Sequence, residues 1–260
     1  MLNSVCEPYK ELEEVLQTFE EQLEFFFSKD FETKTINPKQ DENLGQVFTS
    51  AILAKFMIGL LKDTLKPNSF ILDPCIGPNT FFKAMTEDFS KCNLKGIEID
   101  NNLITLETTE FYESPNRSLI QGSFFDFPVS EKFDLVIQNP PYVRQELLTD
   151  GANSKESIRY NVSSLLSTIP SQSNLYIYFL LKSILHLKDG GVMVAVIYDS
   201  WLYSSFGKFL KESFLKLGHL DSIYHFKKSA FDDVEICATV IKFVKDKNHK
   251  KSISYYPLND

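Results

Sequence analysis

The chain has 260 residues, and 43% of them are hydrophobic, which is enough for one large core or for one domain with a small extension. Its formal net charge is −8, whereas a free-standing DNA-binding protein usually carries an excess of Lys and Arg to neutralise phosphates. A role on DNA would therefore need a basic surface confined to one cleft, or another domain or subunit that holds the DNA. The four cysteines are scattered and form no CxxC pair, which argues against a zinc site and against a disulfide framework.

The N-terminus is acidic and lacks the basic and then apolar pattern of a secretion signal. No apolar run is long enough to span a bilayer. Together with the cysteine usage, these features predict a protein of the reducing cytoplasm, with no membrane partner and no metal.

Residues 1–40 are predicted to form an extension to the main domain, which we place at residues 41–260. Apolar residues at helical spacing predict an amphipathic helix over residues 8–28, namely Leu12, Leu16, Phe19, Leu23 and Phe26. We expect this helix to pack on the main domain, and docking to another subunit is the alternative. The polar residues 29–44 predict a linker.

The main domain is predicted to begin with a helix and to continue with alternating strands and helices. Either Thr49 or Ser50 is suited to cap the first helix, which runs on through Leu60. Apolar runs predict seven strands, at residues 69–73, 94–99, 117–120, 133–138, 191–198, 222–227 and 236–244. Further helical stretches lie near residues 79–89, 101–112, 174–187 and 203–217.

This alternation predicts an α/β fold. Because the strands are continuously apolar, we expect a mainly parallel sheet with helices on both faces. A short turn region over residues 227–235 joins the last two strands, and it predicts an antiparallel hairpin at the end of a seven-stranded mixed sheet. Residues 143–173 lack periodicity, and so long a loop in a compact domain is usually functional or disordered.

The sharpest local signal is Asn139-Pro140-Pro141-Tyr142, directly after the predicted strand at 133–138. Ligands of open parallel sheets bind at the carboxyl ends of the strands, so this turn should face a cleft. The two prolines stiffen the turn, which then presents an amide side chain, backbone carbonyls and an aromatic ring. An ordinary strand-to-loop turn is the alternative interpretation.

Such a turn suits the methylation of an exocyclic amine, which is a poor nucleophile because its lone pair is delocalised into a ring. The Oδ1 atom of Asn139 and the Pro140 carbonyl are candidate acceptors for the two N–H bonds of the amine, and they would favour a more tetrahedral nitrogen. Tyr142 is a candidate to stack on the planar base. No general base with a shifted pKa is required, because the proton can leave after methyl transfer.

Two weaker signals follow earlier strands. The turn Asp73-Pro74-Cys75-Ile76-Gly77 ends the first strand, and its glycine lets the backbone approach a ligand closely, although a tight strand-to-helix turn explains it equally well. Glu98 ends the second strand and can accept hydrogen bonds from ribose hydroxyls. A solvent-facing acid is the alternative, but the spacing of roughly 20 residues from the first turn favours a nucleotide-type site.

Together these motifs resemble those of gamma-type N6-adenine DNA methyltransferases, the catalytic domains of restriction–modification enzymes, over about residues 41–245. The family's motif continues as Asn-Pro-Pro-Tyr-Val-Arg-Gln-Glu, here residues 139–146, and a Gly-Gln-x-Phe-Thr segment precedes its first strand, here residues 45–49. The resemblance implies a Rossmann-like methyltransferase fold, S-adenosyl-L-methionine as the cofactor, and methylation of adenine N6 in DNA.

The resemblance also implies roles for individual residues. The cofactor contacts are Val47, Thr49, Asp73, Gly77, Glu98, Ile99, Phe124 and Asn139, with Asp73 and Gly77 at the methionine moiety, Glu98 at the ribose, and Ile99 and Phe124 at the adenine ring. The catalytic residues are Asn139, Pro140, Tyr142 and Phe231. Tyr142 and Phe231 would sandwich the target adenine, which must be flipped because its amine is inaccessible within a stacked duplex.

Two positions depart from the family pattern. Asn79 stands where the first turn usually has a second Gly, and Asn tolerates left-handed backbone geometry better than most residues. Ser123 stands where the family commonly has an Asp that contacts the cofactor's adenine, so cofactor binding is expected to be weaker unless Asp126 substitutes.

Two other functions remain open at this point. One is a related methyltransferase that acts on a protein glutamine or on RNA, because a planar amide or amine poses the same chemical problem. The other is a catalytically silent module that binds cofactor or a partner, to which Asn79 and Ser123 lend support. The segment Gly45-Gln46-Val47-Phe48-Thr49 favours the DNA family.

The partner expected from the resemblance is DNA with a flipped adenine. Gamma-type enzymes normally place a target-recognition domain after the terminal hairpin, and this sequence ends at Asp260, soon after it. We therefore expect a separate target-recognition domain or subunit, and weak specific DNA binding by this chain alone.

Overall fold

The computed structural model describes residues 46–85, 89–143, 169–170, 173–226, 237–246 and 253–258. All of these residues belong to one compact unit that spans residues 38–260. The predicted helix over residues 8–28, the linker that follows it and the domain boundary near residue 40 lie outside the described residues. No helix in the described part of the chain combines the length and the apolarity needed to cross a membrane.

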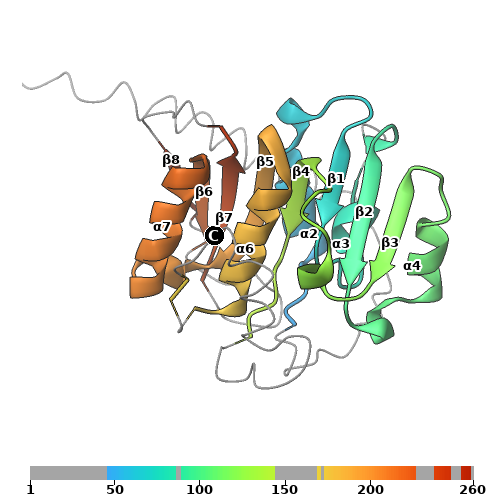
Figure 1. The fold of residues 1–260 in the computed structure, drawn as a ribbon, viewed down its shortest axis with the longest axis horizontal. Coiled ribbons are helices and arrows are strands. Elements are labelled where there is room, and N and C mark those ends of the chain that lie inside the picture. The colour runs from blue at the N-terminus through green and yellow to red at the C-terminus, as the bar shows by residue number, and fades with distance from the viewer. Residues whose placement is uncertain are drawn as a thin grey trace, which may run out of the picture. The chain divides into compact units, whose positions relative to one another are not determined.

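The described strands form one mixed sheet of eight strands in the order β3–β2–β1–β4–β5–β7–β6–β8 (Figure 1). The strands β1 to β5 run parallel to one another, β7 is antiparallel to both β5 and β6, and β8 is parallel to β6. The strands are β1 (Phe70–Asp73), β2 (Asn93–Glu98), β3 (Arg117–Gln121), β4 (Phe133–Gln138), β5 (Leu187–Tyr198), β6 (His219–Phe226), β7 (Ala238–Val244) and β8 (Ser254–Leu258).

The predicted α/β class, the parallel sheet and the terminal antiparallel hairpin are confirmed, but the strand count of seven is wrong. The additional strand is β8, which pairs with β6 at the edge of the sheet. Its residues are half-buried or exposed, and Pro257 lies within it, so no buried apolar run marks it in the sequence. Edge strands need only one partner, and β6 supplies that partner from more than 25 residues away in the chain.

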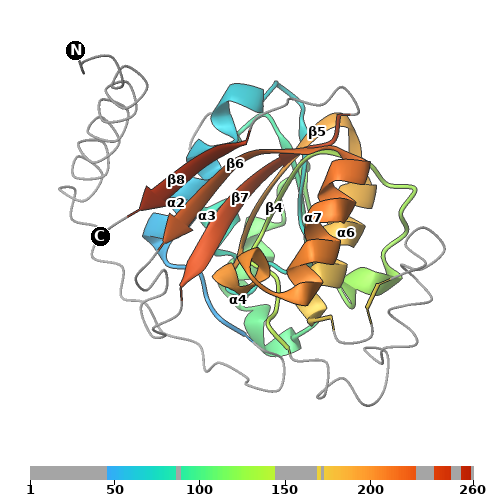
Figure 2. The same ribbon diagram turned by 90° about the vertical axis from the view of Figure 1, so that its left-hand side faces the viewer.

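Helices cover both faces of the sheet, as predicted. Figure 2 shows α6 (Leu175–His186) and α7 (Ser205–Leu217) on one side and α2 (Ala51–Gly59) and α3 (Thr80–Lys83) on the other. Each side has its own apolar cluster: the first includes Leu72 and Val136, and the second includes Ile71 and Leu135. Consecutive strand residues thus enter opposite clusters, which is why the strands are continuously apolar.

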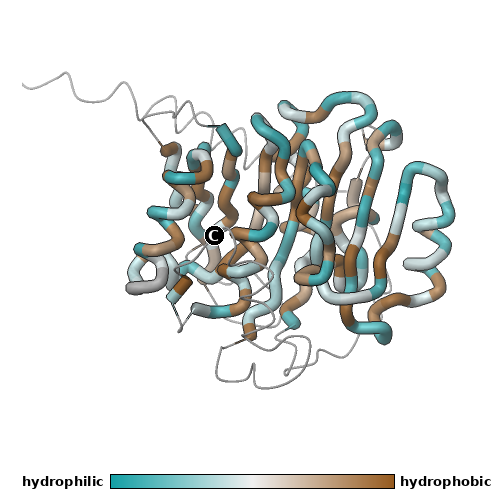
Figure 3. Tube along the Cα trace, in the orientation of Figure 1, coloured by the Kyte–Doolittle hydropathy of each residue, from teal (hydrophilic) through white to brown (hydrophobic). Residues whose placement is uncertain are grey.

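Two predicted helices are shorter in the structure. The stretch predicted at 101–112 divides into the 3-10 helix η4 (Asn101–Leu103) and α4 (Leu106–Phe111), because Thr105 caps a new helix by accepting from the backbone N–H of Thr108 at 3.3 Å. In the stretch predicted at 79–89, α3 ends at Lys83, and residues 86–88 lie outside the described part of the chain. Further short helices are η2 (Lys62–Thr64), η5 (Phe124–Asp126) and η7 (Asp199–Leu202). Figure 3 shows that hydrophobic residues concentrate in the strands, whereas the loops at the top of the view are mostly hydrophilic.

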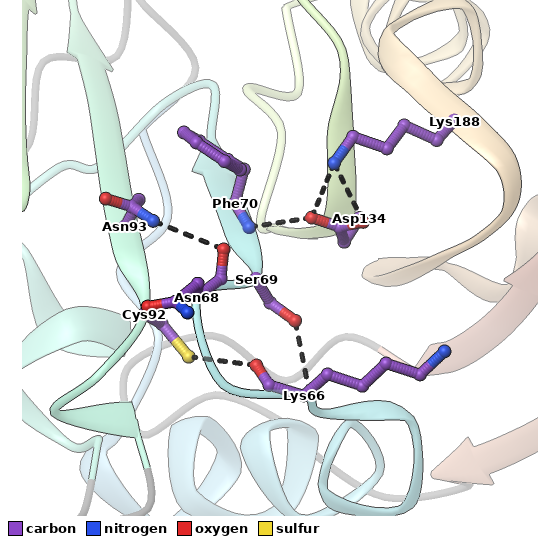
Figure 4. Close-up of polar contacts among 8 residues, drawn as sticks. All are labelled: Lys66, Asn68, Ser69, Phe70, Cys92, Asn93, Asp134 and Lys188. Carbon is purple, nitrogen blue, oxygen red and sulfur yellow. Dashed lines mark hydrogen bonds and ion pairs between the residues drawn. The ribbon is translucent and has the colours of Figure 1, made fainter.

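Polar contacts tie the strands together at the amino ends of β1 and β4 (Figure 4). The backbone N–H of Phe70 donates to Asp134 Oδ2 at 2.8 Å, and Lys188 Nζ contacts both oxygens of the same carboxylate at 2.8 and 2.9 Å. Asp134 therefore connects β1, β4 and β5 on the side where these strands begin. The carboxyl ends of the same strands are left to form the functional site.

His186, the last residue of α6, is fully buried against aromatic rings. Its ring stacks on Phe127 with centroids 5.0 Å apart, and its Nδ1 lies 2.9 Å from the carbonyl oxygen of Glu131. Burial is the main reason that the pKa of His186 is lowered from 6.5 to about 4. The folded protein thus holds a neutral imidazole over a pH range in which the unfolded chain binds a proton.

Acidification should therefore destabilise the protein through His186. Below pH 6.5 the unfolded chain binds a proton that the folded chain does not bind until pH falls to about 4, so this stability is lost as pH falls across that window. The expected loss is about 2 kcal/mol between pH 7 and pH 5. Urea unfolding at several pH values checks it, with His186→Asn as the control that does not titrate. An equal pH slope in both proteins would contradict the assignment.

Candidate active site

A cavity of about 270 Å³ opens at the carboxyl ends of the parallel strands. The strand order reverses between β1 and β4, and open α/β sheets bind ligands at such a switch point. Most of the wall is formed by five chain segments and by Leu175 and Phe179 of α6, and Thr80, Phe81, Leu103 and Val143 complete it. The segments are residues 46–49, 74–78, 98–99, 122–125 and 139–141. Its size is near the lower end of the range for small-molecule sites, about 300 Å³.

Asn139 follows β4 directly and lies at this switch point. Its Nδ2 donates to the carbonyl oxygen of Val47 at 2.7 Å and contacts Thr49 Oγ1 at 3.0 Å. Its Oδ1 is buried and has no hydrogen-bond partner within the described protein. A buried acceptor without a partner is costly, so this oxygen is available for a donor brought by a ligand.

The backbone at Asn139 is held from the neighbouring turn. Cys75 Sγ donates to the carbonyl oxygen of Asn139 at 3.2 Å. Burial, followed by the nearby Asp73 and Glu98, raises the pKa of the Cys75 thiol, so the thiol keeps the proton that it donates. Pro140 and Pro141 continue the cavity wall from this fixed point. Asn139 and Pro140 were predicted to face a cleft, and both line the cavity.

The turn after β1 passes close to the cavity through two residues with left-handed backbone. Gly77 has φ 53°, and Asn79 has φ 65° and ψ 30°. Asn79 thus adopts the left-handed geometry that Asn tolerates, at the position of the family's second Gly. The Asn79 side chain is fully buried, and its Oδ1 accepts from the Tyr112 hydroxyl at 3.3 Å.

Asp73 lies behind the wall rather than on it, contrary to the predicted contact with the methionine moiety. It is fully buried, does not line the cavity, and accepts with Oδ1 from the backbone N–H of Cys75 at 3.1 Å. Burial raises the pKa of this carboxyl well above its ordinary value. Asp73 is the last residue of β1, and its side chain is used to hold the turn that carries Gly77.

Glu98 lies on the wall at the end of β2, as predicted. Its two oxygens accept backbone N–H groups of Gly77 and Asp100, each at 2.8 Å, so the carboxylate joins the turns after β1 and β2. It is only 6% exposed, and burial raises its pKa. Each oxygen retains further acceptor capacity for a hydroxyl in the cavity.

The apolar part of the wall lies at the same end as Glu98. Ile99, which is 43% exposed, and the buried Phe124 both line the cavity, as predicted. Phe124 packs on Phe179 with ring centroids 5.3 Å apart. Lys182 Nζ donates to the Phe125 carbonyl at 2.6 Å and lies 5.2 Å from the Phe124 ring centroid, which anchors this turn to α6.

Ser123 and Asp126 have different positions relative to the cavity. Ser123 lines the cavity, but its Oγ accepts from the backbone N–H of Phe125 at 3.2 Å and caps η5. Asp126 is exposed and does not line the cavity, so the expectation that it substitutes for the family's acid is wrong.

Tyr142 is placed differently from the prediction. It is 8% exposed and does not line the cavity. Its hydroxyl donates to the Val196 carbonyl at 2.9 Å, and its ring stacks on Tyr198 with centroids 3.8 Å apart and planes at 12°. Stacking of this ring on a base stays a prediction, and so does the role of Phe231, which lies outside the described residues.

Four residues that support the site were not predicted: Cys75, Phe179, Lys182 and Tyr198. Lys182 alone leaves a sequence signal, because it interrupts the apolar face of a helix in which eleven of twelve residues are buried. No group of three or more His, Cys, Asp or Glu side chains with metal-site geometry occurs among the described residues.

A family model and several curated proteins match the sequence of this chain. The family model described as Eco57I restriction-modification methylase matches residues 49–231, which is more than half of the chain. The type II methyltransferase M.HincII of Haemophilus influenzae is 29% identical over 207 residues, covering 79% of this chain and 38% of that protein. The chain spans about two fifths of the length of the first curated relatives that it matches.

Solved structures share the fold. A Listeria monocytogenes protein, described as a candidate class I S-adenosylmethionine-dependent methyltransferase, aligns with a TM-score of 0.69 and 18% identity, covering 87% of this chain and 70% of that one. The methyltransferase subunit of a type I restriction-modification system from Streptococcus thermophilus aligns with a TM-score of 0.67 and 21% identity, covering 82% and 47%. The Rossmann-like methyltransferase fold is thereby confirmed.

The left-handed turn at Asn79 provides a test of the local geometry. Asn79→Ala and Asn79→Gly both remove the buried amide, but only Ala places a Cβ on a backbone with φ 65°. We expect the Ala variant to be less stable than the Gly variant by about 1 kcal/mol, measured by urea unfolding. The reverse order of stability would show that residue 79 does not hold this conformation in solution.

Proposed function

Because the chain belongs to the Eco57I restriction-modification methylase family, we propose that it methylates the N6 amine of adenine in DNA with S-adenosyl-L-methionine as the methyl donor. The observation that carries the proposal is the buried, unpartnered Oδ1 of Asn139 at the switch point of the sheet. An oxygen in this state favours a ligand with an N–H to donate, and an exocyclic amine has two.

The residues of the cavity wall fit the proposed cofactor. The Glu98 carboxylate is suited to ribose hydroxyls, and the apolar Ile99 and Phe124 are suited to an adenine ring. The backbone at Gly77 allows the methionine moiety of the cofactor to approach closely. Two carboxyl groups, those of Asp73 and Glu98, are buried in this region, which raises their pKa values, and a positively charged ligand would offset the cost of their ionisation.

The cofactor supplies a methyl group on a sulfonium, so that a new N–C bond forms as the S–C bond breaks and neutral thioether leaves. Asn139 Oδ1 and the Pro140 carbonyl accept the two N–H bonds of the substrate amine and direct its lone pair out of the ring plane. The nitrogen then loses one proton after transfer. Among the described residues of the wall, the ionisable side chains are Cys75 and Glu98, and neither is needed as a base.

The proposed substrate is an adenine that is flipped out of the DNA duplex, because its amine cannot otherwise reach Asn139. Tyr142 and Phe231 are proposed to stack on the flipped base. For Tyr142 this requires the ring to exchange Tyr198 for the base or to use its other face. The net charge of −8 supports a division of labour in which a separate recognition domain or subunit binds the DNA phosphates.

Incubation with methyl-labelled S-adenosylmethionine tests the proposal. The substrates are a random-sequence DNA without prior methylation, an RNA pool and a protein mixture, each at high concentration because binding by this chain is expected to be weak. We expect label in DNA, recovered as N6-methyldeoxyadenosine by mass spectrometry. Label only in RNA or in protein would overturn the DNA proposal. No cofactor binding by calorimetry, with the fold intact, would identify a silent module.

Replacement of Asn139 by Ala should abolish methyl transfer. The variant removes the acceptor for the substrate amine but leaves Glu98, Ile99 and Phe124 in place, so turnover should fall at least about a hundredfold and cofactor affinity should stay within a few fold. Single-turnover assays and calorimetry measure the two effects. Asn93→Ala, at the opposite end of the strands (Figure 4), is the matched control. Retained turnover in Asn139→Ala would mean that the acceptor role is wrongly assigned.

A further inference from the structure

Asn139 is held by a short segment that lines the site. This segment, residues 46–49, precedes α2 and forms part of the cavity wall. Two of its members contact the Asn139 amide nitrogen: the Val47 carbonyl at 2.7 Å and the Thr49 hydroxyl at 3.0 Å. We infer that Thr49 is a positioning residue that keeps the Asn139 amide oxygen directed at the substrate, an inference that rests on the proposed function.

The Val47 carbonyl determines which end of the amide faces the segment. A carbonyl oxygen can only accept a hydrogen bond, so it must face Nδ2 rather than Oδ1 of Asn139. Rotation of the amide by 180° would bring two acceptors to about the present distance of 2.7 Å. The same rotation would direct an N–H donor at a substrate amine that itself needs acceptors. The observed orientation is therefore the one that the reaction requires.

Thr49 supplies what the Val47 carbonyl alone lacks. Nδ2 carries two hydrogens, and the second is directed at Thr49 Oγ1. Without this hydroxyl one buried N–H would have no acceptor, and the amide would be held by the Val47 carbonyl alone. The hydroxyl accepts from Asn139 and can still donate its own hydrogen, so a cofactor contact by Thr49 is compatible with the positioning role.

The segment is fixed at both ends, which makes it a firm support. Gln46 Nε2 donates to Asp100 Oδ2 at 2.9 Å and thus holds the segment on the turn after β2. Burial alone would raise the pKa of Asp100, but the hydrogen bonds from Gln46 and Asn102 outweigh it, and the pKa is lowered. At the other end, Ser50 caps α2 by accepting from the backbone N–H of Leu53 at 3.2 Å. Thr49 lies directly before this cap.

The kinetic test compares two substitutions at one position. Thr49→Val keeps the side-chain shape but removes the acceptor, so kcat at saturating cofactor and DNA should fall at least about tenfold, the effect of one lost hydrogen bond. Thr49→Ser keeps the hydroxyl and should restore kcat to within about twofold. If Thr49 served only to bind the cofactor, saturation would rescue the Val variant, and an unchanged kcat would overturn the inference.

A second measurement needs neither DNA nor turnover. In ¹⁵N spectra of the cofactor-free protein, the Asn139 side-chain amide is assigned by its loss in Asn139→Ala. We expect its protons to exchange slowly with solvent in the wild type and in Thr49→Ser, and at least about tenfold faster in Thr49→Val. Thr80→Val, at another threonine of the cavity wall, is the matched control and should leave these signals unchanged.

The two measurements separate the inference from the proposed function. Slow exchange that is lost in Thr49→Val, in a protein that methylates no substrate, would support the positioning role and reject the proposed function. Exchange that is equal in the wild type and in Thr49→Val would reject the positioning role, whatever the activity. Thermal unfolding of each variant verifies that the fold is retained.

Discussion

The hydrogen bond between Asn139 Nδ2 and the Val47 carbonyl is the constraint on which the site depends. It joins residues that are 92 positions apart in the chain and fixes the amide orientation at the reversal of the strand order. In this orientation the carboxamide oxygen of Asn139, Oδ1, is buried without a hydrogen-bond partner. Buried polar atoms without a partner are uncommon in folded proteins, and among those of the described residues Asn139 Oδ1 belongs to a residue of the cavity wall.

The sheet supplies the rigidity that this arrangement needs. Strands β1 and β4 pair directly, so the turns that carry Cys75 and Asn139 leave the sheet side by side and can be joined by the thiol-to-carbonyl contact. At the opposite ends of the same strands, Asp134 joins the backbone of β1 to Lys188 of β5 (Figure 4). The Lys188–Asp134 ion pair is partly exposed and adds little stability by itself. Its contribution is to the relative placement of the strands.

Sequence patterns were sufficient for those parts of the site that follow from one strand and its turn. The apolar run before Asn139 identifies a buried strand, and parallel strands end at a common edge, so the position of the site and the place of Glu98 at its edge could be inferred. The left-handed turn at Asn79 could be inferred as well, because its geometry is a property of the residue and its immediate neighbours.

Features that depend on how two strands end relative to each other could not be predicted. Gln138, the last residue of β4, pairs with Ala195, whereas β5 continues to Tyr198. The Val196 carbonyl lies beyond the end of β4, and the Tyr142 hydroxyl satisfies it. Tyr142 is therefore drawn against β5 and stacks on Tyr198 rather than on the cavity wall. Nothing in the four residues of the motif records this difference in strand length.

The distribution of titratable groups bears on how the site works. His186 and Lys182, whose pKa values are lowered to about 4 and about 8 by burial, do not line the cavity. The ionisable side chains on the described wall, Cys75 and Glu98, have raised pKa values and are engaged in holding turns. The wall therefore offers a substrate neutral hydrogen-bond acceptors in fixed positions. Among its described residues it does not offer a general base that is free of such a structural role. A reaction in which the nucleophile needs its lone pair redirected, and in which the proton leaves last, is the chemistry that such a wall can serve.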